Sequence, residues 1–174
     1  LEKRVSGDDR PLRFVVSGSY EFPFSKHGLR GKLAGGWVLN GIYQIQSGAP
    51  LSWGNVIYYG GPLNYNAHNV DRAFDTTRFN TNSKEQLDWN IRTFPSRFNN
   101  LRADKSNNLD ASLIKNTPIT ERINLQFRVE FFNALNHPEF NAPNLGASSS
   151  DFGRITSQAN DIGRVGQLGL RLVW

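Results

Sequence analysis

The chain has no cysteine and no long hydrophobic run. Without cysteine there are no disulfide bonds, no zinc–thiolate sites and no thiol catalysis. No stretch approaches the roughly 18 consecutive apolar residues of a membrane-spanning helix, so a helical membrane protein is excluded as well. A transmembrane β-barrel is not excluded, because its strands alternate in polarity and leave only a weak hydropathy signal.

The sequence contains no basic block. The formal net charge of +5 comes from 20 Lys and Arg and 15 Asp and Glu scattered over 174 residues. Nucleic-acid binding needs a clustered basic face, so we expect no nucleic-acid partner. The histidines His27, His68 and His137 lack metal-ligand spacing, and we find neither a nucleophile elbow nor a carboxylate dyad. We therefore expect no metal, no cofactor and no enzymatic activity.

Alternation of apolar and polar residues with a period of two is the strongest pattern present. It is clearest in RINLQFRVEFF, where Leu125, Phe127 and Val129 alternate with polar residues. It recurs in LRFVVSGSYEFPF, GWVLNGIYQIQSG, LDASLIKN and the terminal VGQLGLRLVW. Successive side chains of a strand point to opposite faces, so each segment predicts a strand with one apolar and one polar face. We predict an all-β fold, an antiparallel meander of about five long strands.

The lengths and connections of these strands are typical of an outer-membrane barrel. The strands, at about 10–13 residues, exceed the usual 5–6 and match the roughly 9–11 that a tilted strand needs to cross a bilayer. The connections SKHGLRGKLAG and NTPITER are short, whereas residues 49–106 and 134–162 form long connections. Short turns on one side and long extracellular loops on the other characterise the C-terminal segment of a transmembrane β-barrel.

The alternation also predicts a strand register. Folding LDASLIKN onto RINLQFRVEFF about Ile119 places Asp110 opposite Arg128 and Leu113 opposite Leu125. Polar residues then meet polar residues, and apolar residues meet apolar ones, as cross-strand pairing requires.

Aromatic residues are predicted to mark the two membrane interfaces. If Trp174 ends on the periplasmic side, three further aromatics fall at the same inner interface: Phe22, Phe24 and Trp37. Phe14 and Phe131 fall at the opposite edge. Such aromatic girdles flank the apolar band of outer-membrane barrels. The terminal strand, with Leu168, Leu170, Leu172 and Trp174 on its apolar face, is predicted to be paired and lipid-facing.

Several of these segments resemble one known family. LDASLIKNTPITERINLQFRVEFFNALNHPEF, FGRITS and the aromatic terminus resemble the C-terminal barrel of Oar-like TonB-dependent receptors of the carboxypeptidase-regulatory-like-domain-containing type. VSGSYEFPF and GGWVLNGIYQIQSGAPLS resemble the preceding hairpin. The resemblance covers nearly the whole chain. It is most specific in FFNALNHP and weakest over residues 50–106.

The resemblance implies a bacterial outer-membrane location and a plugged barrel of about 22 strands. The chain shows no plug, no energy-coupling segment and no N-terminal domain, and it begins LEKRVSGDDR without an initiator Met or a signal peptide. Five strands are fewer than the roughly eight of the smallest single-chain barrels. We therefore expect residues 1–174 to be the C-terminal fragment of a receptor barrel, unable to transport alone.

The resemblance also implies four partners. They are outer-membrane lipid, the missing N-terminal barrel and plug of the same chain, a TonB-type energy-coupling protein acting through that missing part, and the barrel-assembly machinery. In this class of protein the machinery reads the terminal strand.

Two groups of residues are candidates for binding. The first is a polar wall predicted to face the lumen, where residues hold the plug, line a substrate path or simply satisfy one another. Its members are Arg13, Glu21, Asp110, Arg128, Glu130 and Arg171. The second is a set of aromatics in the first long loop, which either stack on a ligand or pack the loop against itself. Its members are Trp53, Tyr58, Tyr59, Tyr65 and Trp89.

The favoured function is energy-coupled uptake or movement of a large substrate, as part of an outer-membrane receptor or transporter. One alternative is a structural or adhesive outer-membrane protein whose barrel anchors surface loops. Another is a soluble carbohydrate-binding β-sandwich, which requires the apolar faces of all strands to meet in a common core.

Overall fold

A computed structural model describes four stretches of the chain, residues 3–24, 28–86, 94–159 and 163–174. The chain divides into two compact units. The sheet unit comprises Phe14–Ile45, Asn107–His137 and Ile162–Trp174, and the loop unit comprises Leu1–Arg13, Gln46–Ser106 and Pro138–Asp161. No helix among the described residues is long and apolar enough to span a membrane.

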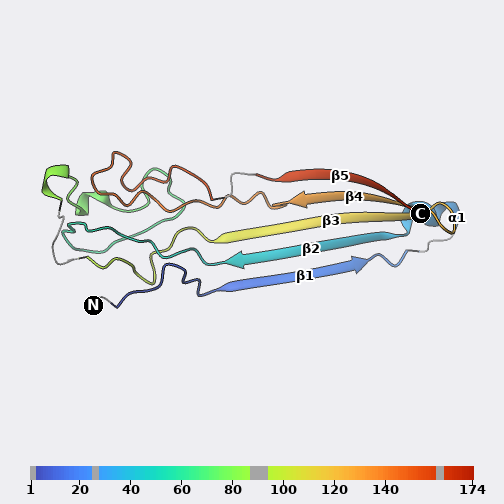
Figure 1. Cartoon of the computed structure of the whole chain (residues 1–174), viewed down its shortest axis with the longest axis horizontal. Coiled ribbons are helices and arrows are strands. Elements are labelled where there is room, and N and C mark those ends of the chain that lie inside the picture. Colours follow the sequence, from blue (N-terminus) through green and yellow to red (C-terminus); the bar gives the residue numbers. More distant parts are fainter. Residues whose placement is uncertain (1–2, 25–27, 87–93, 160–162) are drawn as a thin grey trace. The chain divides into compact units, whose positions relative to one another are not determined.

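The sheet unit contains the five strands that the alternation predicts. They are β1 (Arg13–Glu21), β2 (Trp37–Gln46), β3 (Ser106–Pro118), β4 (Asn124–Phe132) and β5 (Val165–Val173). They form one antiparallel, unclosed sheet in the order β1-β2-β3-β4-β5 (Figure 1). The all-β meander is therefore confirmed, and each strand pairs with its neighbour in sequence.

One face of this sheet is apolar and uncovered. Across β4 and β5, Leu125 lies opposite Leu172, Phe127 opposite Leu170, and Val129 opposite Leu168. Leu170 is 71% exposed and Leu168 is 74% exposed. A soluble β-sandwich would cover this face with a second sheet, so that alternative is wrong for the sheet unit.

The register between β3 and β4 differs from the predicted one. Arg128 lies opposite Ile114 and not opposite Asp110, a displacement of four residues. The turn explains the difference, because the Thr120 hydroxyl accepts hydrogen bonds from the amides of Arg122 and Ile123. This side-chain-capped turn sets where the hairpin reverses. A displacement by an even number of residues keeps every side chain on its predicted face.

One end of the sheet carries the predicted inner aromatics. The Phe22 amide donates to the Trp37 carbonyl, so these residues are neighbours, and Trp174 follows the end of β5 at the same end of the sheet (Figure 1). The Phe22 and Phe24 rings stack with centroids 5.9 Å apart. The structure also adds a helix that the sequence reading treated as a plain short connection, α1 (Gly28–Ala34), between β1 and β2.

Gly36 joins α1 to β2 in a conformation that excludes a side chain. Its φ is +73°, and a Cβ atom there would lie 2.3 Å from the Asn116 carbonyl oxygen. We expect Gly36→Ala to destabilise the sheet unit by roughly 1–3 kcal/mol, because it adds backbone strain and a clash. Gly18→Ala is the matched control, since a Cβ at Gly18 meets nothing within 4 Å. Denaturant unfolding in detergent measures both, and equal stabilities would contradict the expectation.

The loop unit has a hydrophobic core of its own. Three buried phenylalanines surround Trp53, whose ring stacks on Phe79 with centroids 5.3 Å apart. The core residues are Trp53, Val56, Ala73, Phe74, Phe79, Phe94, Ala147, Phe152 and Ile155. They come from both long connections, so the described parts of residues 49–106 and 134–162 fold together. Two 3-10 turns, Thr76–Arg78 and Ser83–Glu85, are its only helical elements among the described residues.

An arginine ties the N-terminal segment into the loop unit. The Arg102 guanidinium donates to the Asp9 carboxylate at 2.5 Å and to the carbonyl oxygens of Asp9 and Asn99 at 2.9 and 2.8 Å. A planar guanidinium can bind several acceptors at once, so a single side chain here connects two segments far apart in sequence.

Candidate functional site

A line of side chains joined by hydrogen bonds and one ion pair crosses the polar face of the sheet. We call it the polar ladder, and it comprises Asn116, Gln126, Arg128, Glu130 and Gln167. Gln126 donates to Asn116 Oδ1 at 2.9 Å, and Arg128 Nε donates to Gln126 Oε1 at 2.7 Å. Glu130 lies 3.9 Å from the Arg128 guanidinium and accepts from Gln167 at 2.8 Å. The ladder therefore links β3, β4 and β5.

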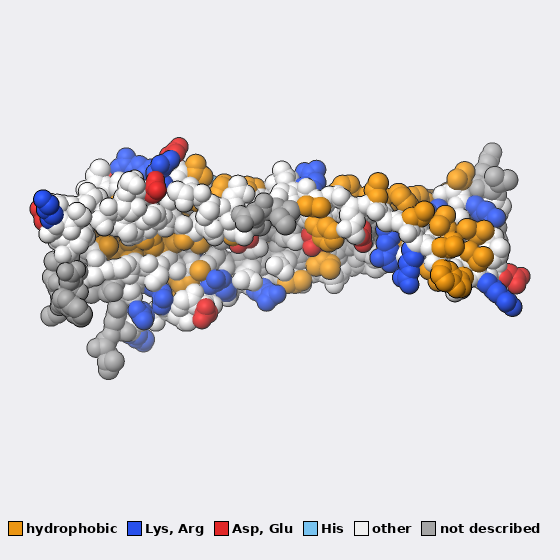
Figure 2. All heavy atoms as spheres, turned by 45° about the horizontal axis from the view of Figure 1, so that its top comes forward, with side chains coloured by type: hydrophobic (Ala, Val, Ile, Leu, Met, Phe, Trp, Pro, Cys, Tyr) orange, Lys and Arg blue, Asp and Glu red, His pale blue; other side chains and the backbone are white. Residues whose placement is uncertain are grey.

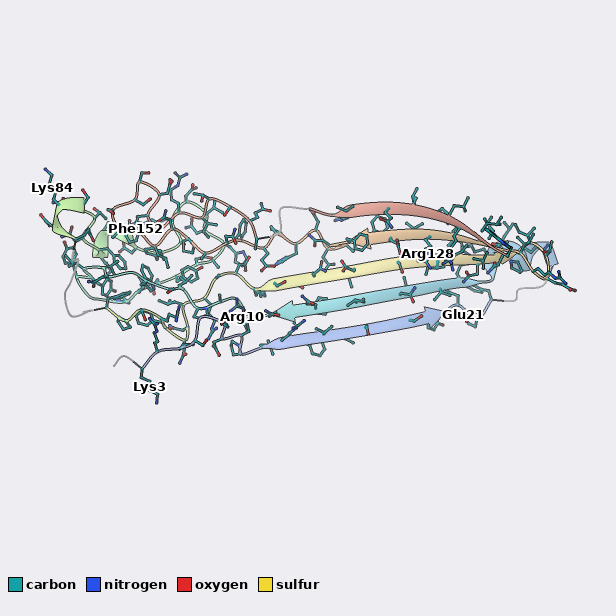
Figure 3. All side chains as sticks on the ribbon, viewed as in Figure 1. Lys3, Arg10, Glu21, Lys84, Arg128 and Phe152 are labelled. Atoms are coloured by element: carbon teal, nitrogen blue, oxygen red, sulfur yellow. The ribbon has the colours of Figure 1, made fainter. Side chains whose placement is uncertain are left out.

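The structure brings together only part of the predicted polar wall. Arg128 and Glu130 belong to the ladder, and Arg171 lies opposite Gln126, beside it. Arg13 and Glu21 stand at the two ends of β1, and Figure 3 shows Glu21 near the α1 end and Arg128 within β4. Arg128, Glu130 and Arg171 lie on one face of the sheet, because Gln126 is opposite Arg171 and Glu130 is opposite Gln167.

The predicted ion pair between Asp110 and Arg128 is wrong, and Asp110 has a different role. Its Oδ1 accepts from the backbone amide of Asn133 at 3.0 Å and from the Asn108 side chain at 3.0 Å. The carboxylate thus fastens the exit of β4 to β3. The displaced register is the reason, because it moves Arg128 out of reach of Asp110.

The stretch FFNALNHP, which carries the family resemblance most specifically, forms a compact exit turn after β4. Asn133 and Asn136 adopt left-handed φ values of 49° and 51°. The Asn133 side chain accepts from the His137 amide at 3.0 Å, and the Asn136 side chain accepts from the Arg164 amide at 3.0 Å. Asparagine tolerates this conformation, and its side chain readily forms hydrogen bonds with nearby backbone amides. The pair of asparagines is therefore the sequence feature that predicts this turn.

Most of the loop aromatics proposed as ligand contacts are packed inside the loop unit. Trp53 is 3% exposed in the core, and Tyr58 and Tyr65 are partly buried against it. The expectation that Trp53 contacts a ligand is therefore corrected, because no face of its ring is free. Tyr59 is 65% exposed and stays a candidate. Trp89 lies outside the described residues.

A comparison with known families decides what this two-faced sheet is. Residues 1–167 match the model of the family described as outer membrane beta barrel domain. The chain belongs to this family. No curated protein and no solved structure matches the chain.

Membership of the outer membrane beta barrel domain family indicates what each face of the sheet contacts. The protein is located in the bacterial outer membrane, as predicted. In such barrels the apolar face of each strand contacts lipid and the polar face lines the interior. We therefore expect the row containing Leu168, Leu170 and Leu172 to face lipid, and the polar ladder to face the inside of the barrel.

A buried carboxylate and a tyrosine lie inside the loop unit of this barrel protein. Asp104 accepts hydrogen bonds from the amides of Lys105 and Phe140, and His68 Nε2 lies 3.6 Å from it. Burial raises the pKa of Tyr65 to about 12, and the negative charge of Asp104 acts in the same direction. Among the described residues, nothing accepts or donates a hydrogen bond at the Tyr65 hydroxyl.

The raised pKa of Tyr65 predicts a loss of stability at alkaline pH. Above about pH 10 the unfolded chain loses the phenol proton while the folded loop unit keeps it, so the free energy of unfolding falls until about pH 12. We expect Tyr65→Phe to abolish this loss and to add about 1 kcal/mol at neutral pH. Tyr59→Phe, at an exposed position, is the control. Urea unfolding followed by near-ultraviolet circular dichroism checks both, and an unchanged alkaline loss in Tyr65→Phe would contradict the assignment.

No group of three or more acidic or histidine side chains in the described part of the chain is arranged to hold a metal ion. The functional residues that the sequence reading missed are amides of the ladder: Asn116, Gln126 and Gln167. These amides alternate with apolar residues, but they carry no charge that distinguishes them from other polar positions. Cross-strand position would have identified them.

Proposed function

We propose that the chain is part of an outer-membrane receptor or transporter barrel, of the Oar-like TonB-dependent type, for energy-coupled uptake or movement of a large substrate. The observation that carries this proposal is the polar ladder on the interior face. The side chains of the ladder are hydrogen-bond partners of one another, and Arg128 and Glu130 still have exposed surface. A wall of this kind suits a removable plug or a passing polar substrate, because it needs neither partner in order to stay ordered.

The proposed mechanism involves no covalent chemistry, no cofactor and no nucleic acid. An energy-coupling protein in the periplasm would act through a plug supplied by the missing part of the chain. Withdrawal of the plug from the wall would open the barrel. The loop unit would capture the substrate on the outer side, with Tyr59 as the described aromatic that remains accessible.

The open edges of the sheet support the proposal that further strands complete the barrel. β1 and β5 each have a neighbour on one side only. In hydrocarbon an unpaired edge leaves backbone groups without hydrogen bonds, so β1 and β5 need partners. The missing N-terminal barrel would supply them, and the barrel-assembly machinery would read β5 and Trp174 during insertion.

A structural or adhesive role is the second candidate, and the core of the loop unit favours it. A unit that buries its own aromatics can present a stable surface without binding a small ligand. Such a protein would need neither energy coupling nor an interior path.

The two candidates differ in their need for an energy-coupling partner. The test is calorimetric binding of the periplasmic domain of a TonB-type protein to the complete protein that contains this chain. The transporter proposal expects saturable binding, together with entry of large antibiotics into cells when Arg128 and Glu130 are both changed to alanine. Lys84→Ala, at an exposed side chain of the loop unit (Figure 3), is the control. Absence of binding, with unchanged antibiotic exclusion, would favour the adhesive role.

A further inference from the structure

The connection between β1 and β2 contains a helix where a few residues would suffice. Hairpin loops commonly need only about 2–5 residues, as the turn after β3 illustrates. A helix as short as α1 is not stable in water by itself, because nucleation is costly. Its formation here must therefore be supported by the rest of the sheet unit or by its surroundings.

The sheet holds α1 by its C-terminal end. The Trp37 indole nitrogen donates to the Leu33 carbonyl at 3.1 Å, and the Gly35 amide donates to the Gly31 carbonyl at 2.8 Å. The Lys115 ammonium donates to the Gly35 carbonyl and lies 5.6 Å from the centroid of the Trp37 ring. These contacts satisfy the carbonyls that a helix leaves free at its end.

The side chains of Lys32 and Leu33 in α1 are exposed. Leu33 is 75% exposed, and Phe24, just before α1, is 53% exposed. Figure 2 shows hydrophobic side chains gathered at the α1 end of the sheet unit, with Lys and Arg side chains beside them. Leu33 and Phe24 are therefore exposed apolar side chains at this end of the sheet unit.

The charge of this connection is of one sign. Between Glu21 and Trp37 the sequence contains Lys26, Arg30 and Lys32 and no Asp or Glu. No acidic group pairs with the exposed Lys32 in the described part of the chain. Arg122, at the same end, differs, because it shares a hollow on the polar side with Glu21 and Glu121.

We propose that α1 is an interfacial anchor that binds the phosphate groups of anionic glycerophospholipids in the inner leaflet of the outer membrane. Short connections of these barrels face the periplasm, which places α1 at that leaflet. Leu33 and Phe24 enter the acyl boundary, Trp37 lies at headgroup level, and Lys32 contacts the phosphate. The proposal rests on membership of the barrel family and not on transport.

Residues 1–174 contain no cysteine, so a single-site test needs only the replacement of any cysteine elsewhere in the complete protein. A bimane probe is attached to Leu33→Cys in the complete protein, which is reconstituted into phosphatidylcholine vesicles containing phosphatidylglycerol. Brominated acyl chains quench a probe that lies in the membrane. Lys84→Cys, in the loop unit, is the reference position that should remain unquenched. One sample carries the bromine on phosphatidylcholine and a second sample carries it on phosphatidylglycerol. The ratio of quenching in the two samples gives the local enrichment of phosphatidylglycerol around position 33.

We expect strong quenching at position 33 and an enrichment of phosphatidylglycerol that falls about fivefold in Lys32→Gln, because one cation near an anionic surface contributes about 1 kcal/mol. Arg122→Gln removes the same charge at the same end of the sheet and should leave the enrichment unchanged. Quenching at position 33 no greater than at position 84 would overturn the proposal. So would equal enrichment in Lys32→Gln and Arg122→Gln. A probe shielded from both bromolipid and aqueous iodide would indicate a covering protein, and would overturn it too.

Discussion

Leu170→Arg is expected to make folding into a bilayer less favourable by about 2–4 kcal/mol, because it puts a cation on the lipid face near the middle of a membrane strand. Leu170 lies near the centre of β5, opposite Phe127, with its side chain on the uncovered apolar face. Hydrocarbon cannot solvate a guanidinium, and the nearest interface is several residues away along the strand.

Gln167→Arg is the matched control on the same strand. Gln167 lies on the opposite face and its side chain donates to Glu130, so an arginine there meets a carboxylate in the polar interior. We expect a change of less than about 0.5 kcal/mol. Urea titration of the complete protein folding into vesicles, followed by the mobility shift of the unheated barrel in gels, measures both variants. Equal tolerance of the two arginines would contradict the assignment of lipid to the apolar face.

The strands could be predicted because their signal is local. In β4, each of Leu125, Phe127 and Val129 is followed by a polar residue, and this pattern alone specifies a strand and its two faces. No distant part of the chain has to be known. The same local pattern assigned Arg128 and Glu130 correctly to the polar face.

The register was mispredicted because alternation is periodic. Any even displacement along a strand satisfies the pattern equally well, so alternation cannot distinguish Asp110 from Ile114 as the partner of Arg128. The Thr120 hydroxyl makes that choice through two hydrogen bonds in the turn. The residues of the turn, and Thr120 above all, therefore carry the signal that sets the register.

Lys115 shows a second kind of missed information. It occupies an apolar position in the alternation of β3, where a lysine looks like an error in the pattern. Its hydrogen bond to Gly35 and its place over Trp37 depend on a helix that the connection sequence did not predict. A charge at a lipid-face position near a strand end is a signal for an interfacial partner.

The fold of the loop unit was beyond the reach of sequence patterns. Trp53, Phe79 and Phe152 have no common spacing, and they meet only because two long connections pack together. Aromatic residues in a loop are equally consistent with a ligand site and with a core. Burial decides between these readings, and burial is a property of the tertiary structure.

Trp53→Ala is expected to destabilise the loop unit by about 3–5 kcal/mol, the usual cost of removing a large buried aromatic. The Trp53 ring contacts Phe74 and Phe94 edge-on, with centroids 5.0 and 5.3 Å away, and stacks on Phe79. Its loss leaves a cavity that these rings cannot fill without rearrangement. Protease sensitivity of residues 49–106 in the complete protein, and loss of the near-ultraviolet circular dichroism signal, measure the effect.

Tyr59→Ala separates the two readings of the loop aromatics. Tyr59 is exposed, so we expect its removal to change stability by less than about 0.5 kcal/mol, and to lower any ligand affinity of the loop unit while the unit stays folded. If Trp53 were a ligand contact, Trp53→Ala would leave the loop unit protease-resistant and weaken only binding. A loop unit that unfolds in Trp53→Ala and persists in Tyr59→Ala therefore assigns Trp53 to the core, and leaves ligand capture to the exposed surface of the loop unit.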